Sequence, residues 1–340
     1  MAMRLSKDDE MTVWKRLGLG VLLAIGLALG LGLVQAAAVA WRVAQVSAPH
    51  PEDGPGDRAR TRYPIVLVHG MMGFDHLGPL SYWHDIVPRL RAQGAQVYTT
   101  SVSSFNSSEV RGEQLRQQVE AIVRQSGAAK VHLIGHSQGA ATARYVADQR
   151  PELIASVTSV GGPTMGSEVA DWVARLDAEQ PAWGQRLVSV ATAAGELINH
   201  WAGTPLPLDA RATLGSLTTA GSADFNRRHP AGVPTDACGD GAHEVAGVRY
   251  YSWTGVGRYR SVLNPADLPM WLTGHLFERE RDDNDGLVGR CASHLGEVLG
   301  DRYPMNHLHE VRLFGGYTSG DPDPASLYLA HAERLKALGL

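Results

Sequence analysis

The chain has 340 residues, which is enough for one large domain with an N-terminal extension, and it shows no internal repeat. Its formal net charge is -4 at pH 7, and no stretch concentrates lysine and arginine. Nucleic-acid binding is therefore not expected, because that function needs a basic surface.

The N-terminal segment, residues 1–44, is predicted to be a separate module. Residues 17–40 are all Leu, Gly, Ala, Val or Ile except for one Gln, and none is charged. Lys15 and Arg16 precede this run. A helix of that length can cross the apolar core of a bilayer. Because the basic pair stays in the cytoplasm, the rest of the chain is expected to be exported.

Two interpretations of this module remain open. The apolar run could end near Val34, with the small residues 36–40 or 46–48 providing the cleavage site of a signal peptide. Residues 17–40 could instead be retained as a transmembrane helix that tethers the protein. Residues 45–61, rich in Pro, Gly and charge, are predicted to be a linker to one large domain over residues 62–340.

The first strand of that domain is predicted to deliver a turn suited to stabilising negative charge. Residues 63–68 read Tyr-Pro-Ile-Val-Leu-Val, and His69, Gly70 and Met71 follow directly. In serine hydrolases one donor of the oxyanion hole comes from the loop after an early strand. The backbone N–H of Met71 is the candidate donor here.

The motif Gly-His-Ser-Gln-Gly at residues 135–139 is the most informative in the chain. It follows a short run of Val, Leu and Ile and precedes a helical stretch over residues 140–149. This context is typical of a nucleophile elbow, in which a tight turn exposes the serine hydroxyl above the sheet. We predict Ser137 to be the nucleophile and the N–H of Gln138 to be the second oxyanion donor. The alternative is that Ser137 only caps the helix.

Residues 167–205 are predicted to form a helical cap. Apolar residues recur there at helical spacing in two series: Val169, Trp172, Val173 and Leu176, then Trp183, Leu187, Val190, Ala191, Ala194, Leu197, Ile198 and Trp201. Two helices packed on the core would give the same pattern. The three tryptophans favour a lid whose apolar face covers the serine in water and turns to lipid at an interface.

An acid and a base are expected downstream of the serine, in the chain order Ser, acid, His. Residues 282–289, Asp-Asp-Asn-Asp-Gly-Leu-Val-Gly, form an acidic turn before an apolar run, which suits a carboxylate at the end of a strand. Asp285 is the preferred acid, and Asp282, Asp283 and Asp301 are its competitors. Among the 14 histidines, His307 is the preferred base, because it lies on a loop after a proline.

The chain contains two cysteines, Cys238 and Cys291. In an exported protein a single pair is expected to form a disulfide. Since Cys291 lies shortly after Asp285, the bridge would also hold the acid-bearing loop.

Five segments together resemble one known family. The runs YPIVLVHGMMGFD, SEVRGEQLRQQVEAIV, GHSQG, NDGLVG and MNHLHEV are similar to the true bacterial triacylglycerol lipases of the Pseudomonas and Burkholderia type, over residues 63–335. The resemblance implies an α/β-hydrolase fold, with a mostly parallel sheet flanked by helices and a helical lid over residues 167–205. It also implies the Cys238–Cys291 bridge and a membrane-bound lipase foldase as a partner.

The resemblance also implies the roles of individual residues. It carries the catalytic roles onto Ser137, Asp285 and His307 and the oxyanion donors onto Met71 and Gln138.

The chain departs from this family at its calcium site. The resemblance implies a structural calcium held by two aspartates near the catalytic histidine, but those positions read Asn264 and His309 here. Imidazole nitrogen is a poor ligand for calcium, and an amide removes a charge. We therefore predict no bound metal or other cofactor, and an Asn264–His309 hydrogen bond as the tether. Asp267 leaves room for a rearranged site.

The sequence thus predicts a secreted or membrane-tethered serine carboxylester hydrolase that acts through an acyl-enzyme. Triacylglycerol or another long-chain ester at a lipid interface is the first choice of substrate. The alternative is an esterase for shorter esters or an aliphatic polyester (polyhydroxyalkanoate) depolymerase. A non-catalytic surface-binding relative is a remote alternative, which the complete set of catalytic residues opposes.

Overall fold

The computed structural model describes residues 55–78, 80–257, 267–281, 283–313 and 323–340. The predicted N-terminal module, including the apolar segment 17–40, and most of the predicted linker lie outside these ranges. None of the described helices is both long and apolar enough to cross a membrane. The end of the predicted linker is part of the folded domain, because the N–H groups of Gly56 and Ala59 donate to the carbonyls of Ala92 and Gln93.

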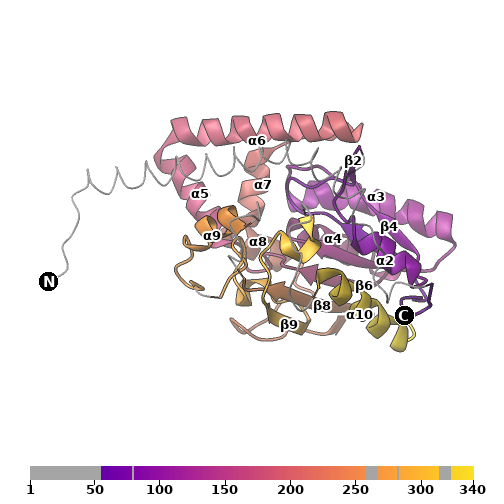
Figure 1. Ribbon diagram of the computed structural model, residues 1–340. Coiled ribbons are helices and arrows are strands. Elements are labelled where there is room, and N and C mark those ends of the chain that lie inside the picture. Colours follow the sequence, from indigo (N-terminus) through magenta and orange to yellow (C-terminus); the bar gives the residue numbers. More distant parts are fainter. Residues whose placement is uncertain (1–54, 79, 258–266, 282, 314–322) are drawn as a thin grey trace.

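A seven-stranded sheet forms the centre of the domain (Figure 1). Its strand order is β4-β1-β5-β6-β8-β7, and β9 also pairs with β8. Only the β7–β8 pair is antiparallel, so the mostly parallel sheet that we predicted is confirmed. The strands are β1 (Ile65–Val68), β4 (Val97–Thr99), β5 (Val131–His136), β6 (Ile154–Val160), β7 (Glu244–Val245), β8 (Val248–Gly255) and β9 (Glu297–Tyr303). A separate hairpin consists of β2 (His76–Leu77) and β3 (Leu80–Ser81).

Helices cover both faces of the sheet, and the central strands are consequently apolar at consecutive positions. Ile65 and Leu67 of β1 face the core shared with α2 and α10, while Val66 and Val68 face the core shared with α3 and α4. The helices are α2 (Ile86–Ala92), α3 (Ser108–Ser126), α4 (Gln138–Gln149), α5 (Glu168–Glu179), α6 (Pro181–Ala202), α7 (Ala210–Leu217), α8 (Thr219–Arg228), α9 (Asp267–Gly274) and α10 (Pro324–Ala337), with short 3-10 turns η1 (Pro151–Leu153), η2 (Cys291–Ser293) and η3 (His309–Val311).

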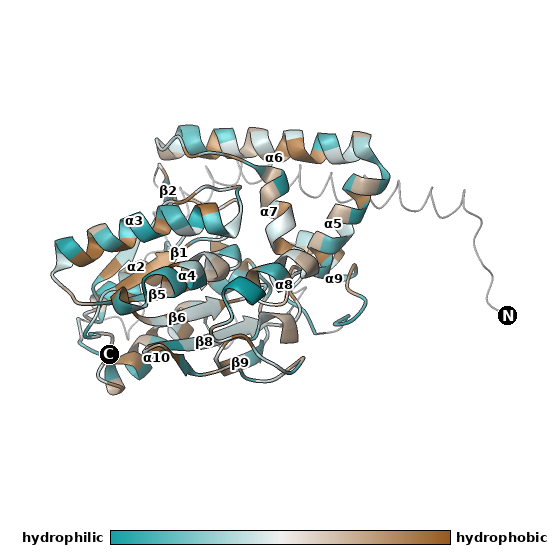
Figure 2. Ribbon diagram, turned by 180° about the vertical axis from the view of Figure 1, so that it is seen from behind, coloured by the Kyte–Doolittle hydropathy of each residue, from teal (hydrophilic) through white to brown (hydrophobic). Residues whose placement is uncertain are grey.

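Helices α5 and α6 form the cap, which was predicted over residues 167–205 and which the structure places at residues 167–202. Figure 1 shows α6 lying along the outside of the molecule, from the end of α5 towards the β2 strand. Polar and apolar residues alternate around this helix (Figure 2). Ile198 packs against the core beside the β2–β3 hairpin, whereas Trp201 is 60% exposed. The helical cap is therefore present, and one end of its second helix rests on the hairpin.

Candidate active site

Ser137 occupies a strained turn between β5 and α4. Its backbone has φ 57° and ψ -129°, a conformation that non-glycine residues rarely adopt. The glycines on either side allow the strand and helix to approach closely. A Cβ on Gly135 would lie 2.3 Å from the carbonyl oxygen of Gly139, and a Cβ on Gly139 would lie 2.3 Å from that of Val68. The elbow geometry that we predicted is thus present at Ser137.

The turn after β1 lies directly against this serine. A Cβ on Gly70 would lie 2.7 Å from the Cβ of Ser137, so only glycine fits between them. Among the described residues, the N–H of the next residue, Met71, has no acceptor. The N–H of Gln138 lies in the first turn of α4, where a helix offers no acceptor of its own. Both predicted oxyanion donors therefore flank Ser137.

Asp285 lies in a tight turn rather than at the end of a regular strand, so our expectation of a strand here is wrong. Its Oδ1 accepts the N–H groups of Leu287 at 2.8 Å and Val288 at 2.7 Å. These are N–H groups that a strand would use for pairing, and the chain is left with a single bridge between Asn284 and Gly289. The side chain of Asp285 thus stabilises the turn in which it lies.

His307 is bound to Asp285 twice. Its Nδ1–H donates to Oδ2 of Asp285 at 2.7 Å, and its backbone N–H donates to the Asp285 carbonyl at 2.9 Å. Both side chains are buried. Burial opposes protonation of His307, but the Asp285 carboxylate outweighs it and raises the pKa of the imidazole above its usual value.

The competing aspartates have other partners. Asp283 pairs with Arg290 and Arg302, and Asp301 pairs with Arg290 and His294. The third competitor, Asp282, lies outside the described residues.

His136 connects the serine turn to the loop that carries His307. Its Nε2–H donates to the carbonyl of His307 at 3.0 Å, and the two rings are 4.6 Å apart. Its Nδ1 accepts from the hydroxyl of Tyr82 at 2.7 Å, and that hydroxyl accepts from the N–H of Gly70 at 3.4 Å. Burial lowers the pKa of His136, which keeps the ring neutral. The residue before Ser137 is thus hydrogen-bonded to His307 inside the protein, although 171 positions separate His136 from His307 in the sequence.

Glu310 adds a second buried carboxyl group beside His307. One of its oxygens lies 3.9 Å from Nδ1 of His307, and the other accepts the N–H of Gly255 at 2.7 Å. Burial, together with the charge of Asp285, raises the pKa of Glu310 to about 8. Burial thus favours the neutral form of the Glu310 carboxyl group beside His307.

Arg111 holds the turn after β1, a role that the sequence did not predict. Its guanidinium is fully buried and donates to the carbonyls of His69, Gly70 and Ser103. A signal for it did exist, because Arg111 lies on the same helix face as the buried Leu115. A charged residue on the apolar face of a helix must have buried polar partners.

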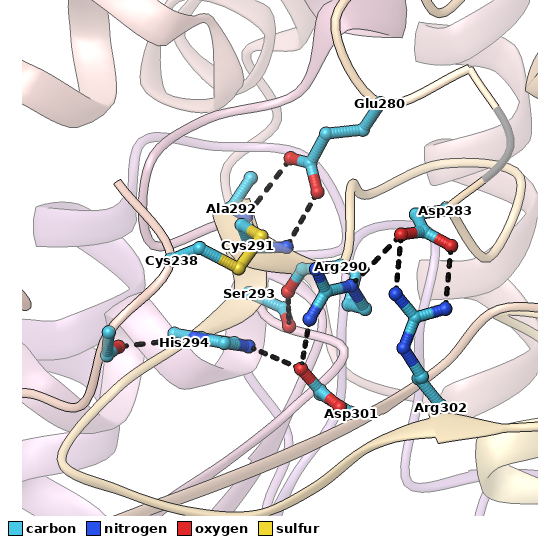
Figure 3. Close-up of a disulfide and its surroundings, with 11 residues drawn as sticks. Cys238, Glu280, Asp283, Arg290, Cys291, Ala292, Ser293, His294, Asp301 and Arg302 are labelled. Atoms are coloured by element: carbon cyan, nitrogen blue, oxygen red, sulfur yellow. Dashed lines mark hydrogen bonds and ion pairs between the residues drawn. A yellow bond between two sulfur atoms is a disulfide. The ribbon is translucent and has the colours of Figure 1, made fainter. Parts of the chain in front are cut away.

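The predicted disulfide is present. Cys238 and Cys291 are bonded, with their Cα atoms 4.6 Å apart (Figure 3). Beside the bond, the Glu280 carboxylate accepts the backbone N–H groups of Cys291 at 2.6 Å and Ala292 at 3.2 Å. A disulfide indicates an oxidising compartment, which supports export of the domain.

A second layer of charged side chains surrounds this bridge (Figure 3). Arg290 contacts both Asp283 and Asp301, while Arg302 donates to Asp283 and His294 contacts Asp301. Since Asp283 and Arg290 lie on opposite sides of the Asp285 turn, their ion pair closes the turn from outside.

Of the two positions that the resemblance implies for calcium ligands, the structure describes only His309, and its surroundings do not suit a calcium ion. The Nε2 of the buried His309 lies 3.4 Å from Oδ1 of Asp267, and the amide of Asn306 donates to the same oxygen at 2.9 Å. This carboxylate thus already faces an imidazole and an amide N–H, which are not calcium ligands. Asn264, and with it the predicted Asn264–His309 hydrogen bond, lies outside the described residues.

Within the described ranges, one group of three side chains has the spacing of a metal site, namely His136, His307 and Glu310. The hydrogen bonds of His136 and His307 given above already use the Nε2 and Nδ1 atoms that face Glu310. This group is therefore explained as part of the site around Ser137.

Comparisons with known proteins agree with this geometry. The sequence model of the alpha/beta hydrolase fold matches residues 63–268. The chain is 50% identical over 283 residues to a triacylglycerol lipase of Vibrio cholerae, covering 83% of this chain and 90% of that relative. It is 43% identical over 292 residues to a triacylglycerol lipase of Pseudomonas fragi, covering 84% and 99%. Among solved structures, EstA from Clostridium botulinum shares the fold with a TM-score of 0.53 at 19% identity, covering 81% of this chain and 87% of that one.

Proposed function

The chain belongs to the bacterial triacylglycerol lipases of the α/β-hydrolase family and is a carboxylic ester hydrolase, and from that premise we propose that Ser137, Asp285 and His307 are its catalytic triad. The observation that carries the proposal is the 2.7 Å hydrogen bond between His307 and Asp285, on a loop bonded to the residue before the strained Ser137.

The proposed reaction proceeds through an acyl-enzyme. Ser137 attacks the ester carbonyl while Nε2 of His307 takes the hydroxyl proton and then delivers it to the leaving alcohol. Asp285 fixes the tautomer of His307, because its carboxylate accepts the proton on Nδ1. Water then attacks the acyl-enzyme while His307 takes its proton, and His307 returns that proton to the Ser137 oxygen as the ester bond to the serine breaks and the acid leaves.

The oxyanion is proposed to bind the N–H groups of Met71 and Gln138. Met71 is held in place by the carbonyl contacts that Arg111 makes to the preceding residues. Such fixed donors commonly contribute the largest part of the rate enhancement in acyl transfer.

Triacylglycerol or another long-chain ester is the proposed substrate. The similarity to named triacylglycerol lipases and the helical cap with its exposed Trp201 and Leu197 support this proposal. In water the cap is proposed to shield the serine, and at a lipid interface its apolar side chains would contact lipid. A shorter ester or an aliphatic polyester is the alternative substrate.

We further propose that the loop carrying His307 is tethered without a metal. His309 and Asp267 provide a contact between the loop and α9, and Arg312 provides a second one by pairing with Asp85 and Asp323. No other cofactor is proposed. We propose that the chain is exported and is either released by cleavage of its N-terminal module or tethered by residues 17–40, with a membrane-bound foldase as its partner.

The decisive experiment labels the purified protein with a fluorophosphonate and locates the adduct by mass spectrometry. We expect one adduct, on Ser137, and none on a Ser137→Ala variant. Hydrolysis rates across a series of acyl lengths, with and without an emulsion, then separate the two substrate proposals. A rate that rises with chain length and with the interface supports long-chain esters, and a rate highest for soluble short esters supports the alternative.

A further inference from the structure

The first turn of the cap helix α5 is bonded to the loop that carries the proposed catalytic acid. Ser167, which caps this helix, accepts the N–H of Ala170 at 3.3 Å and also donates its hydroxyl proton to the carbonyl of Leu287 at 2.6 Å. The second hydrogen bond does not contribute to the N-terminal capping of α5. It reaches a residue two positions after Asp285, inside the acid turn.

The next residue of the cap holds the other side of the same loop. The Glu168 carboxylate accepts three backbone N–H groups, those of Glu278 at 2.9 Å, Arg279 at 3.1 Å and Glu280 at 3.4 Å. These hydrogen bonds outweigh the effect of partial burial and lower the pKa of Glu168, so the group is charged at neutral pH. All three donors lie outside α5 and shortly before Asp285.

A third side chain fixes this turn to the body of the domain. Asp171 accepts both the backbone N–H of Thr219 at 2.8 Å and its hydroxyl at 2.6 Å. By contrast, the only buried residues of the long helix α6 are two glycines, Gly184 and Gly195. The cap therefore has a firmly bonded root and a weakly packed arm.

We propose that Ser167 and Glu168 are positioning residues for catalysis, which hold the Asp285 turn in register with His307 from the root of the cap. The inference rests on the proposed role of Asp285. Because the contacts lie on both sides of Asp285, movement of the cap arm at an interface leaves the acid in place only while this root stays bonded.

The test uses the full chain and a soluble short-chain p-nitrophenyl ester, whose hydrolysis does not need a lipid interface. We expect Ser167→Ala to lower kcat by about tenfold with little change in KM, because a small displacement of a catalytic group already costs this much. The downfield proton NMR signal of the His307–Asp285 hydrogen bond should shift or weaken in the same variant. Ser167→Thr, which keeps the hydroxyl, should restore both.

Ser126→Ala is the matched control. The Ser126 hydroxyl accepts the N–H of Ala128 at 3.2 Å and donates to the carbonyl of Val123 at 3.4 Å, so its loss removes an equivalent pair of hydrogen bonds at the C-terminal end of α3, away from the acid. This variant should lose a similar amount of stability while keeping kcat and the NMR signal. Glu168→Gln provides an independent second variant, since it removes the charge that the three N–H groups bind.

The outcomes separate the two proposals. Wild-type kcat in both Ser167→Ala and Glu168→Gln, while Asp285→Asn is impaired, would overturn the positioning role and leave the triad intact. An unimpaired Asp285→Asn variant would instead remove the proposed acid itself. Loss of emulsion hydrolysis with normal turnover of the soluble ester would show that the residues act on the cap alone, and would also overturn the inference.

Discussion

The two halves of the site are held by different means. In the sheet half, Ser137 and Met71 lie at the ends of β5 and β1, where backbone packs on backbone and glycines leave no room for side chains. In the loop half, Asp285 and His307 lie on loops that side-chain hydrogen bonds, ion pairs and a disulfide fasten. The sheet half therefore depends mainly on close backbone packing, to which Arg111 adds hydrogen bonds, whereas the loop half depends mainly on contacts between side chains.

Substituting the proposed nucleophile in the sheet half and the proposed base in the loop half should reduce activity by similar amounts. We expect Ser137→Ala and His307→Ala each to lower kcat/KM by roughly 10⁴-fold or more, because nucleophile and base act as a unit. Asp285→Asn should cost less, since both other groups remain. Ester hydrolysis rates and circular dichroism of the purified variants check this, and substantial turnover by Ser137→Ala would contradict the assignment.

The disulfide should separate them most clearly. Reduction, or the double variant Cys238→Ser with Cys291→Ser, releases a loop with a sequence separation of 53 residues, for which loop entropy allows about 4 kcal/mol. We expect a lower Tm and a loss of activity through slackening of the Asp285 turn. Thiol counting by mass spectrometry is the control. Two free thiols in the natively exported protein would show that the bridge does not form.

A single methyl group should damage the sheet half in the same assays. In Gly139→Ala the new Cβ would meet the carbonyl of Val68 at 2.3 Å, and neither backbone can move away. Overpacking of this kind costs about 1–3 kcal/mol, and it should also displace Ser137. Gly215→Ala, whose Cβ would meet nothing within 4 Å, is the control and should keep its Tm. Equal behaviour of the two variants in urea unfolding would refute the steric argument.

Low pH should destabilise the sheet half. Burial lowers the pKa of His69, with the charge of Arg111 adding to it, and that of His132, in each case to about 3. An unfolded histidine takes up its proton near pH 6.5, so the native state loses stability as the pH falls from about 6.5 towards 3. Each of the two should contribute a slope of about 1.4 kcal/mol per pH unit in that window.

Urea unfolding at pH 7.5 and 5.0 measures this slope. We expect His132→Asn, which keeps an acceptor for Ser156, to lose less stability on acidification than the wild type. The exposed His243→Asn is the control and should behave like the wild type. Identical slopes in all three proteins would show that His132 is not the source.

The smallest expected effect concerns calcium in the loop half. Because an imidazole and an amide N–H, those of His309 and Asn306, lie against Oδ1 of Asp267, the Tm at neutral pH should not change on adding a chelator. Bound calcium at about 100 times its Kd would contribute about 2.7 kcal/mol, so a drop of several degrees would reveal an ion. Restoring carboxylates as Asn264→Asp with His309→Asp should make the Tm respond to calcium.

The same division explains how far the sequence could be interpreted. The elbow and the oxyanion turn follow from local pattern, since a β-branched strand, a glycine and a helix in direct succession allow little else. The acid did not follow from pattern alone. Four aspartates were candidates; the acidic turn made Asp285 the preferred one, and the family resemblance strengthened that preference. The sequence did not reveal the ion pairs that occupy two competitors, Asp283 with Arg302 and Asp301 with His294.

Two features of the fold were beyond the sequence. The strand expected near Asp285 does not form, because that side chain takes the N–H groups that pairing would need. The contacts of Arg111 and Glu168 join segments far apart in the chain, so no local pattern specifies them. The cap, with its helical periodicity, was predicted within a few residues of the observed helices.

The link between His136 and His307 has a consequence for the order in which the molecule is made. The two residues are 171 positions apart, and α10, near the end of the described chain, packs Tyr328 against Trp253 of the sheet. Ribosomes deliver the N-terminal part first, so the elbow emerges long before its base. We expect the enzyme to be inert throughout its own synthesis, which spares the lipids of the cell that produces it.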